Sequence, residues 1–216
     1  MTVAIENDAL SEPFEANRGK SYGMVIDLDK CTGCSACAVA CKMENDVDLG
    51  VFWNRVYRMG PIGHYPDALE MFYFPNSCMH CEHPSCIEVC PTKATYKTDD
   101  GVVLVDEGRC FGCQYCIWAC PYEARMLNPN KKVVEKCILC VHRLEKGEQP
   151  MCAYTCTTGC RIAGDLNDPE SAISKTLAQN SDRVYRVHPE FGNKPKVIYL
   201  LPRKGAETLW KSIGHS

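Results

Sequence analysis

The sequence lacks the features that would mark an enzyme, a nucleic-acid-binding protein or a membrane-spanning protein. It contains no P-loop and no G-x-G-x-x-G, G-x-S-x-G or H-E-x-x-H motif, so no catalytic constellation is predicted. Its 24 Lys and Arg residues are outnumbered by 27 Asp and Glu, a net charge of −3, so a nucleic-acid-binding surface is not expected. No run of about 18 apolar residues occurs, so no membrane-spanning helix is predicted.

Apolar side chains for a hydrophobic core are also scarce, whereas cysteine is abundant. The apolar fraction of 45% includes 17 cysteines among the 216 residues, which leaves a thin supply of Leu, Ile, Val, Phe and Met. Bound metal supplies folding free energy directly, because the metal site does not exist in the unfolded chain. We therefore expect metal binding to replace part of the core, and an apo chain that is not stably folded.

Sixteen of the cysteines form four groups of four, called here groups one to four. Groups one and three have the spacing C-x2-C-x2-C-x3-C, group two has C-x2-C-x4-C-x3-C, and group four opens with C-x2-C and closes with C-x3-C. In order, the groups are Cys31, Cys34, Cys37 and Cys41; Cys78, Cys81, Cys86 and Cys90; Cys110, Cys113, Cys116 and Cys120; and Cys137, Cys140, Cys152 and Cys156. Such runs bind [4Fe–4S] clusters. The pattern predicts four [4Fe–4S] clusters in a protein that carries electrons.

The spacing has a physical reason. Two residues between cysteines let a short turn place successive sulfurs on neighbouring irons, and Gly33 and Gly112 suit such turns. A gap of three residues fits one helical turn, so the fourth sulfur of a group faces the next cluster. Pro91 and Pro121 follow the fourth cysteine of groups two and three and prevent simple continuation of the helix. Each group is therefore expected to link two clusters.

Zinc, disulfides and scattered structural cysteines are the alternatives. Structural zinc sites use two C-x2-C pairs, and the C-x2-C-x2-C triplets would crowd three thiolates onto one ion. Disulfide frameworks are typical of short secreted chains. Scattered structural cysteines do not explain a spacing that recurs four times. The pattern favours an iron–sulfur protein over all three.

Short helices and strands are expected between the cysteine groups. Asp168 and Pro169 have the character of an N-cap and first residue of a helix that runs to about Gln179. Residues 50–75 are expected to form a long connector with one strand at 71–74. Further predictions are strands at 23–28 and 196–201, a helix at 36–42, and a β-hairpin of 96–98 with 102–105 around an Asp-Gly turn.

Groups two and three are contiguous and end alike, so we expect them to form one two-cluster module, with groups one and four paired around it. The predicted fold class is α+β, with two interleaved bacterial-type 2[4Fe–4S] ferredoxin-like modules and much irregular loop structure. The predicted divisions are an N-terminal arm at 1–22; an outer module at 23–75 and 125–165; an inner module at 76–124; and a C-terminal helix, strand and tail at 166–216.

The four groups resemble those of the four-cluster iron–sulfur subunits of DMSO-reductase-type molybdopterin oxidoreductases. The resemblance also rests on the C-x2-C-x11-C-x3-C form of group four and on Gly-Asp-Leu-Asn-Asp-Pro at 164–169, and it covers roughly residues 22–202. This family includes the electron-transfer subunits of DMSO, polysulfide, tetrathionate and arsenate reductases and of phenol and catechol enzymes. The resemblance implies a molybdopterin cofactor, with Mo or W, in a separate catalytic subunit.

The resemblance also implies which cysteines share a cluster. The implied sets are cluster a, Cys31, Cys34, Cys37 and Cys156; cluster b, Cys41, Cys137, Cys140 and Cys152; cluster c, Cys78, Cys81, Cys86 and Cys120; and cluster d, Cys90, Cys110, Cys113 and Cys116. Some relatives have tryptophan at the position of Cys113 and a three-iron cluster there. Because this chain keeps cysteine, four cubane clusters are expected.

One departure from the family concerns the seventeenth cysteine. Relatives commonly have proline after the last ligand, but here Cys156 is followed by Thr-Thr-Gly and then Cys160. Because Cys156 and Cys160 also have ligand spacing, a shifted assignment with Cys160 as a ligand is the alternative. We favour Cys156 as the ligand and Cys160 as a buried free thiol.

Other polar and aromatic residues lie close to the cysteines in the sequence. His80 is expected to form hydrogen bonds, pack in its loop or contact a partner rather than bind iron. Trp118 and Tyr122 are expected to shield a cluster from water. Lys136 and Arg143 either raise the potential of a nearby cluster or are ordinary solvated side chains.

The resemblance implies the partners and the location. We expect an electron-transfer subunit, not an enzyme by itself, that connects a large molybdopterin catalytic subunit with a membrane-anchor or quinol subunit or a soluble electron carrier. Neither nucleic acid nor a direct membrane span is expected. The alternatives are a free-standing polyferredoxin and the β subunit of a formate dehydrogenase or hydrogenase. The expected location is a membrane-associated complex, extracytoplasmic through co-export with the catalytic subunit, with the cytoplasm as the alternative.

Overall fold

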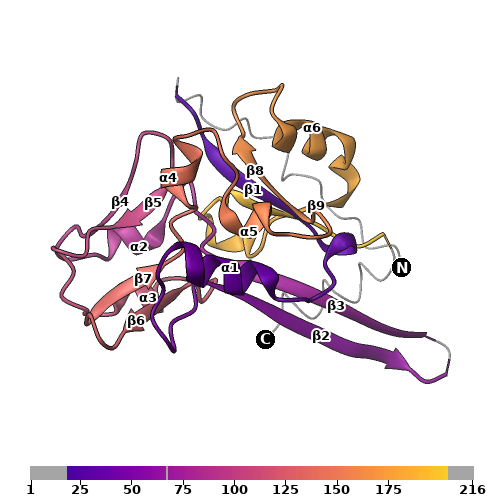
Figure 1. The fold of residues 1–216 in the computed structure, drawn as a ribbon, viewed down its shortest axis with the longest axis horizontal. Coiled ribbons are helices and arrows are strands. Elements are labelled where there is room, and N and C mark those ends of the chain that lie inside the picture. Colours follow the sequence, from indigo (N-terminus) through magenta and orange to yellow (C-terminus); the bar gives the residue numbers. More distant parts are fainter. Residues whose placement is uncertain (1–18, 67, 204–216) are drawn as a thin grey trace.

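The computed structural model describes residues 19–66 and 68–203, in which short helices and strands are joined by irregular loops (Figure 1). This confirms the mixed α+β class. The predicted arm at 1–22, except its last four residues, and the tail beyond residue 203 lie outside the described residues. Within the part of the chain that the structure describes, no helix has the length and apolarity needed to cross a membrane.

A four-stranded sheet joins the beginning of the described chain to its end. Its order is β8 (Arg161–Asp165), β1 (Tyr22–Asp27), β10 (Val197–Leu200) and β9 (Val184–Tyr185). Strand β1 is parallel to β10 and antiparallel to β8, with Met24 opposite both Val197 and Ala163. Every residue of β1 and β10 is buried, because both faces of the sheet are covered.

The two faces of this sheet have different neighbours. Helix α6 (Ala172–Gln179) covers one face, where Ile173 packs with Val25, Ile198 and Leu200. The alternate residues of the strands, including Met24, Ile26 and Tyr199, belong to a second cluster that also contains cysteines from several groups. The sheet is therefore the wall against which the cysteine-bearing loops are held.

A long two-stranded ribbon extends from the body of the molecule (Figure 1). It consists of β2 (Asn54–His64) and β3 (Ala68–Ser77), which pair antiparallel with a register shift between Met59 and Ile62. The prediction of a connector with one strand at 71–74 was therefore wrong. Pro61 obscured the first strand, but it lies at the register shift, where a missing N–H breaks no ladder bond.

The base of the ribbon is fixed to the sheet by aromatic and polar contacts. The ring of Phe74 stacks on that of Tyr199 with centroids 4.6 Å apart, and the Tyr199 hydroxyl donates a 2.8 Å hydrogen bond to the Pro75 carbonyl. These two contacts hold the ribbon against the sheet. At the same end of β1, the guanidinium of Arg183 pairs with Asp27 at 2.7 Å and joins the sheet to the segment before β9.

Most of the cysteines lie in the loops that join short helices and two small hairpins. The third cysteine of every group lies in a helix: Cys37 in α1, Cys86 in α2, Cys116 in α3 and Cys152 in α5. The bounds are α1 (Ala36–Glu44), α2 (Ser85–Glu88), α3 (Tyr115–Trp118), α4 (Val141–Leu144), α5 (Met151–Tyr154), β4 (Thr95–Lys97), β5 (Val103–Val105), β6 (Arg125–Asn128), β7 (Val133–Lys136), and three 3₁₀ turns, η2 (Leu28–Lys30), η3 (Ser181–Arg183) and η4 (Pro189–Phe191). The helical turn expected from the x3 spacing is confirmed.

Most of the remaining predicted elements are confirmed to within one or two residues. The strands at 23–28 and 196–201, the helix at 36–42 and the hairpin around residues 99–101 all occur. The predicted helix start at Asp168 was wrong, because α6 begins at Ala172 with Ser171 as its N-cap. The Asp168 carboxylate instead accepts the Glu170 N–H at 2.9 Å and forms a turn before the helix.

Candidate metal centres

Three interior cavities are each lined by four cysteines from two different groups. The space between the side chains that line them is about 340, 310 and 320 Å³, including the part that is open to solvent. In the same order, their cysteines are Cys41, Cys137, Cys140 and Cys152; Cys78, Cys81, Cys86 and Cys120; and Cys90, Cys110, Cys113 and Cys116. Every cavity thus receives three cysteines from one group and one from another.

Of the remaining cysteines, Cys37 lies in α1 and Cys156 follows the end of α5, and these two helices pack together. Cys160 is buried, with its Sγ 3.4 Å from that of Cys156. A hydrogen bond between the thiols of Cys160 and Cys31 lowers the pKa of Cys31 and raises that of Cys160. Cys34 is exposed, whereas Cys37 is buried. The structure therefore places Cys160 in contact with both Cys31 and Cys156.

The four groups share a backbone conformation that only partly shows in the sequence. The residue before the second cysteine has a positive φ in all four: 71° at Gly33, 43° at His80, 73° at Gly112 and 55° at Leu139. A Cβ at Gly33 would lie 2.2 Å from the Tyr73 ring, so glycine is needed there for space as well. The sequence indicated this turn only where it carries glycine and missed it at His80 and Leu139.

Backbone N–H groups from the turns and from strand β7 lie close to several of the sulfurs. The N–H of Leu139 donates to Cys137 Sγ at 3.3 Å, that of Val134 to Cys110 Sγ at 3.4 Å, and that of Cys160 to Cys156 Sγ at 3.3 Å. Hydrogen bonds to the sulfurs are one means by which proteins set iron–sulfur potentials. The thiol donor sets, the enclosed spaces and these N–H groups together fit [4Fe–4S] clusters.

Three buried cations lie among the cysteines. Arg125, Lys136 and Arg161 are each less than 5% exposed, at 4%, 2% and 3%. Arg125 donates to Cys86 Sγ at 2.9 Å, and Arg161 lies 3.8 Å from Cys152 Sγ. Lys136 donates to the carbonyls of Cys137 and Val103. Lys136 is therefore not an ordinary solvated side chain, and nothing in the sequence indicated the two buried arginines.

Burial and the cations act in opposite directions on the thiols. Burial raises the pKa of Cys86 to about 11, although the positive charge of Arg125 lowers it. Burial likewise raises the pKa of Cys41 to about 12, with Arg161 acting against it. Because cysteine binds metal as the thiolate, these buried cations favour the form that coordinates iron.

The histidine, aromatic and arginine side chains near the cysteines differ in burial and in hydrogen-bond or ion-pair partners. His80 is buried and its Nδ1 accepts the Val103 N–H at 3.1 Å, which confirms a hydrogen-bonding role. Tyr122 is buried beside the second cavity, but Trp118 is 87% exposed, so shielding was a wrong prediction for Trp118. Arg143 pairs with Glu148 at 3.1 Å and also with Glu44, so its charge is balanced by carboxylates.

Two families of iron–sulfur domains match the chain. A 4Fe-4S dicluster domain matches residues 69–166, and a 4Fe-4S binding domain matches residues 22–43. The two matches together include all four cysteine groups.

Relatives of known kind match most of the sequence. The B subunit of tetrathionate reductase from Salmonella typhimurium is 41% identical, over 88% of this chain and 76% of the relative. The B subunit of sulfite dehydrogenase from Allochromatium vinosum is 43% identical, over 84% and 83%. The B component of polysulfide reductase from Wolinella succinogenes is 42% identical, over 86% and 96%. Two of these relatives are named as parts of reductases and one as a subunit of a dehydrogenase.

Proposed function

Because this protein belongs to the family of iron–sulfur subunits of the DMSO-reductase-type oxidoreductases, we propose that it carries electrons to or from a molybdopterin catalytic subunit through four [4Fe–4S] clusters. The observation that carries this proposal is the set of three cavities, each lined by four cysteines from two groups. When bound, such clusters accept and release single electrons. The substrate of the complex would be transformed in the catalytic subunit.

We assign the ligands of three clusters by the cavities and those of the fourth by the resemblance of the cysteine groups to those of the family. The cavity cysteines would hold clusters b, c and d in the order given above for the three spaces. Cys31, Cys34, Cys37 and Cys156 would hold cluster a, with Cys160 beside it as a free thiol. In this assignment, the fourth cysteine of each group is a ligand of the neighbouring cluster, and two ferredoxin-like modules interleave along the chain.

The arrangement supports the order a, b, c, d for the path of electrons. Cys37 of cluster a lies close enough to Cys152 of cluster b for its negative charge to contribute to the raised pKa of the Cys152 thiol. Cys78 of cluster c acts in the same way on the buried thiol of Cys137, a ligand of cluster b. Arg125 interacts with both Cys86 of cluster c and Cys116 of cluster d. Adjacent clusters would thus be near neighbours at every junction.

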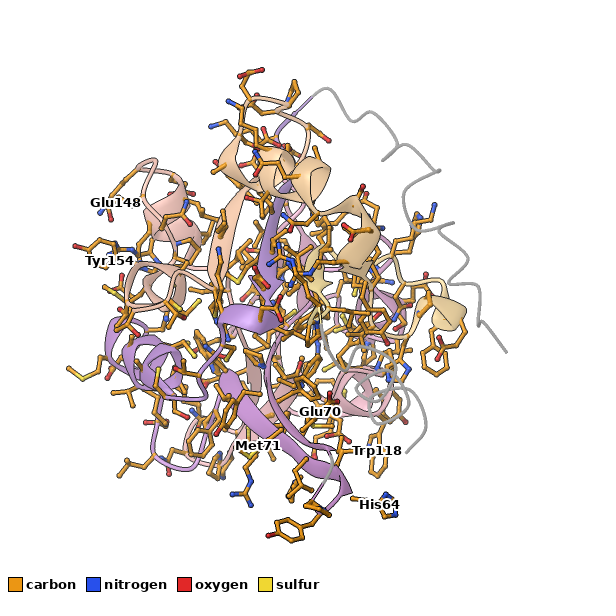
Figure 2. The ribbon with its side chains drawn as sticks, turned by 90° about the vertical axis from the view of Figure 1, so that its right-hand side faces the viewer. His64, Glu70, Met71, Trp118, Glu148 and Tyr154 are labelled. Atoms are coloured by element: carbon orange, nitrogen blue, oxygen red, sulfur yellow. The ribbon has the colours of Figure 1, made fainter. Side chains whose placement is uncertain are left out.

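Exposed apolar side chains at the two ends of this path support docking of two partners. Near cluster d, Phe111 is 64% and Trp118 87% exposed, and near cluster a, Met43 is 81% and Tyr154 72% exposed. Figure 2 shows Trp118 and Tyr154 on opposite sides of the molecule. We assign the Trp118 side to the molybdopterin subunit. The Tyr154 side would then bind a membrane-anchor or quinol subunit, or a soluble carrier.

Co-purification tests this function. The tagged chain, isolated from its native host, should bring down a large subunit that contains molybdenum or tungsten. Trp118→Asp should lose that subunit and keep its iron, whereas Tyr154→Asp should keep the subunit and lose the second partner. A monodisperse protein that purifies alone with full iron content would instead support a free-standing polyferredoxin.

Protease treatment of intact spheroplasts tests the expected extracytoplasmic location of the complex, since only an exposed complex is cleaved.

A further inference from the structure

Three buried cations have no carboxylate partner among the described residues. Arg125, Lys136 and Arg161 form no ion pair with a described Asp or Glu, although a buried charge costs several kcal/mol when it is unpaired. Two other buried cations do have such partners: Arg183 pairs with Asp27 at 2.7 Å, and Lys196 lies 3.9 Å from Glu82. The counter-charge for the first three must therefore come from something other than a carboxylate.

Arg125 lies between clusters c and d of the proposed assignment. Its Nη2 is 2.9 Å from Sγ of Cys86, a ligand of cluster c, and its other amino group donates to Thr95 at 3.2 Å. It also forms a side-chain hydrogen bond with Cys116, a ligand of cluster d. Burial opposes its charge, but the neighbouring thiolates outweigh that effect and raise the pKa of Arg125.

Lys136 lies between clusters b and c. Its ammonium group donates to the carbonyl of Cys137, the first of the three ligands that group four gives to cluster b, at 2.9 Å. Burial and the positive charge of Arg125 lower the pKa of Lys136, and the negative charges of Cys78 and Cys86, ligands of cluster c, and of Cys137 oppose this lowering. The carbonyl of Val103 is a second acceptor for the same group.

Arg161 lies between clusters a and b. Its Nη1 is 3.8 Å from Sγ of Cys152, a ligand of cluster b, and its Nη2 donates to Asn54 at 2.9 Å. Burial opposes the charge of Arg161, but Cys152 and then Cys37, a ligand of cluster a, outweigh it and raise the pKa of the guanidinium. Its position in β8 fixes it against the central sheet.

We propose that Arg161, Lys136 and Arg125 form a series of fixed positive charges, one at each junction between successive clusters, and that each raises the reduction potentials of the two clusters that flank it. The inference rests on the proposed ligand assignment. A cubane with four thiolate ligands is an anion whose charge grows by one unit on reduction, and net charge is one determinant of its potential. A buried cation between two such anions stabilises the reduced form of both and weakens the repulsion between electrons on neighbouring clusters.

The test is a potentiometric titration of the purified complex, followed by EPR, with variants at each junction. The variants are Arg125→Gln, Lys136→Met and Arg161→Gln. Each should lower two of the four midpoint potentials by at least about 59 mV, which is a tenfold shift in the equilibrium of a one-electron couple. The two potentials lowered by Arg125→Gln should differ from the two lowered by Arg161→Gln. Lys136→Met should lower one of the two potentials that respond to Arg125→Gln and one of the two that respond to Arg161→Gln.

Matched variants separate charge from structure. Arg109→Gln removes a cation directly before Cys110, but this side chain is 66% exposed and paired with Asp106. Solvent and salt screen such a charge, so the redox equilibrium of each of the four clusters should stay within threefold of its wild-type value. Arg125→Lys keeps the charge and should also stay close to wild type. If Arg125→Lys and Arg125→Gln shift the midpoint potentials equally, packing and not charge sets the potentials, and the inference is overturned.

Two further outcomes are distinguishable. If the wild-type complex shows fewer than four midpoints, or iron for fewer than four clusters, the proposed function fails. If wild type shows all four and the variants move one potential, all potentials or none, the assignment of one cation to each junction fails. Lys136→Met is an independent test if an arginine variant loses iron.

Discussion

Glycine at position 112 offers a direct test of how the loops of the cysteine groups are built. Gly112 precedes the second cysteine of group three and has φ of 73°, a conformation that costs a residue with a Cβ about 1–2 kcal/mol. A Cβ there would also lie 2.4 Å from the carbonyl oxygen of Lys132 in the turn between β6 and β7. Relieving such an overlap typically costs a further 1–3 kcal/mol. Gly112→Ala should therefore cost about 2–5 kcal/mol.

The assay is thermal loss of cluster absorbance in the anaerobic holo-protein, at one scan rate for all variants because cluster loss is irreversible. A cost of this size should lower the apparent melting temperature by roughly 5–20 °C, with early loss of the iron bound by that loop. Gly108→Ala is the control, because Gly108 lies in the same loop without a positive φ, and its nearest contact is the flexible side chain of Asp106 at 3.3 Å. The reasoning is refuted if Gly112→Ala melts within about 2 °C of wild type.

Three further predictions concern the ligands, the ribbon and the metal. Cys156→Ala should lose one cluster by iron analysis and EPR, whereas Cys160→Ala should keep four, because Cys160 is assigned as a free thiol. Tyr199→Phe should lower stability by about 1–3 kcal/mol, measured as a lower melting temperature, because it leaves the Pro75 carbonyl without its 2.8 Å hydrogen bond. Removal of iron by a chelator should abolish the cooperative thermal transition followed by far-UV circular dichroism, because the cysteines line spaces that the apo chain cannot fill.

Each of these has a contrary result that would count against it. Retention of four clusters in Cys156→Ala together with loss of one in Cys160→Ala would exchange the roles of the two cysteines. Tyr65→Phe removes a hydroxyl from a side chain that is 86% exposed and should be neutral, so an equal effect at Tyr65 and Tyr199 would remove the buried hydrogen bond as the cause. A compact apo protein with a sharp transition would show that the side chains alone form a sufficient core.

The sequence predicted those parts of the structure that depend on local spacing. The x3 gap places the third cysteine of each group in a helical turn, and Asp-Gly at 100–101 marks a real hairpin, because both signals depend on neighbouring residues only. The first strand of the ribbon was missed because Gly60 and Pro61 interrupt its pattern, and tertiary pairing with β3 overrides that interruption. The start of α6 was misplaced because Asp168 and Ser171 are both good N-caps, and contacts outside the helix decide between them.

The buried cations show the limit of such reasoning most clearly. An arginine such as Arg125 or Arg161 is usually a surface residue, and the sequence around each gives no sign that its side chain is buried. Only the folding of β6 and β8 against loops from distant parts of the chain brings these side chains to sulfur. The left-handed turns at His80 and Leu139 were missed for a related reason, since neither residue type announces that conformation.

The central sheet has a consequence for the order in which the parts of the protein can fold during synthesis. Strand β1 is synthesised before both of its neighbours, β8 and β10, which come from beyond residue 160, so β1 stays unpaired in a nascent chain until those residues have been made. Groups two and three lie between these strands and leave the ribosome well before the sheet can close. Their part of the protein can therefore mature while the outer part waits for the last strands. A chain shortened before Val197 would have β1 unpaired on one edge, which marks it as incomplete to any protease or chaperone that recognises an open strand.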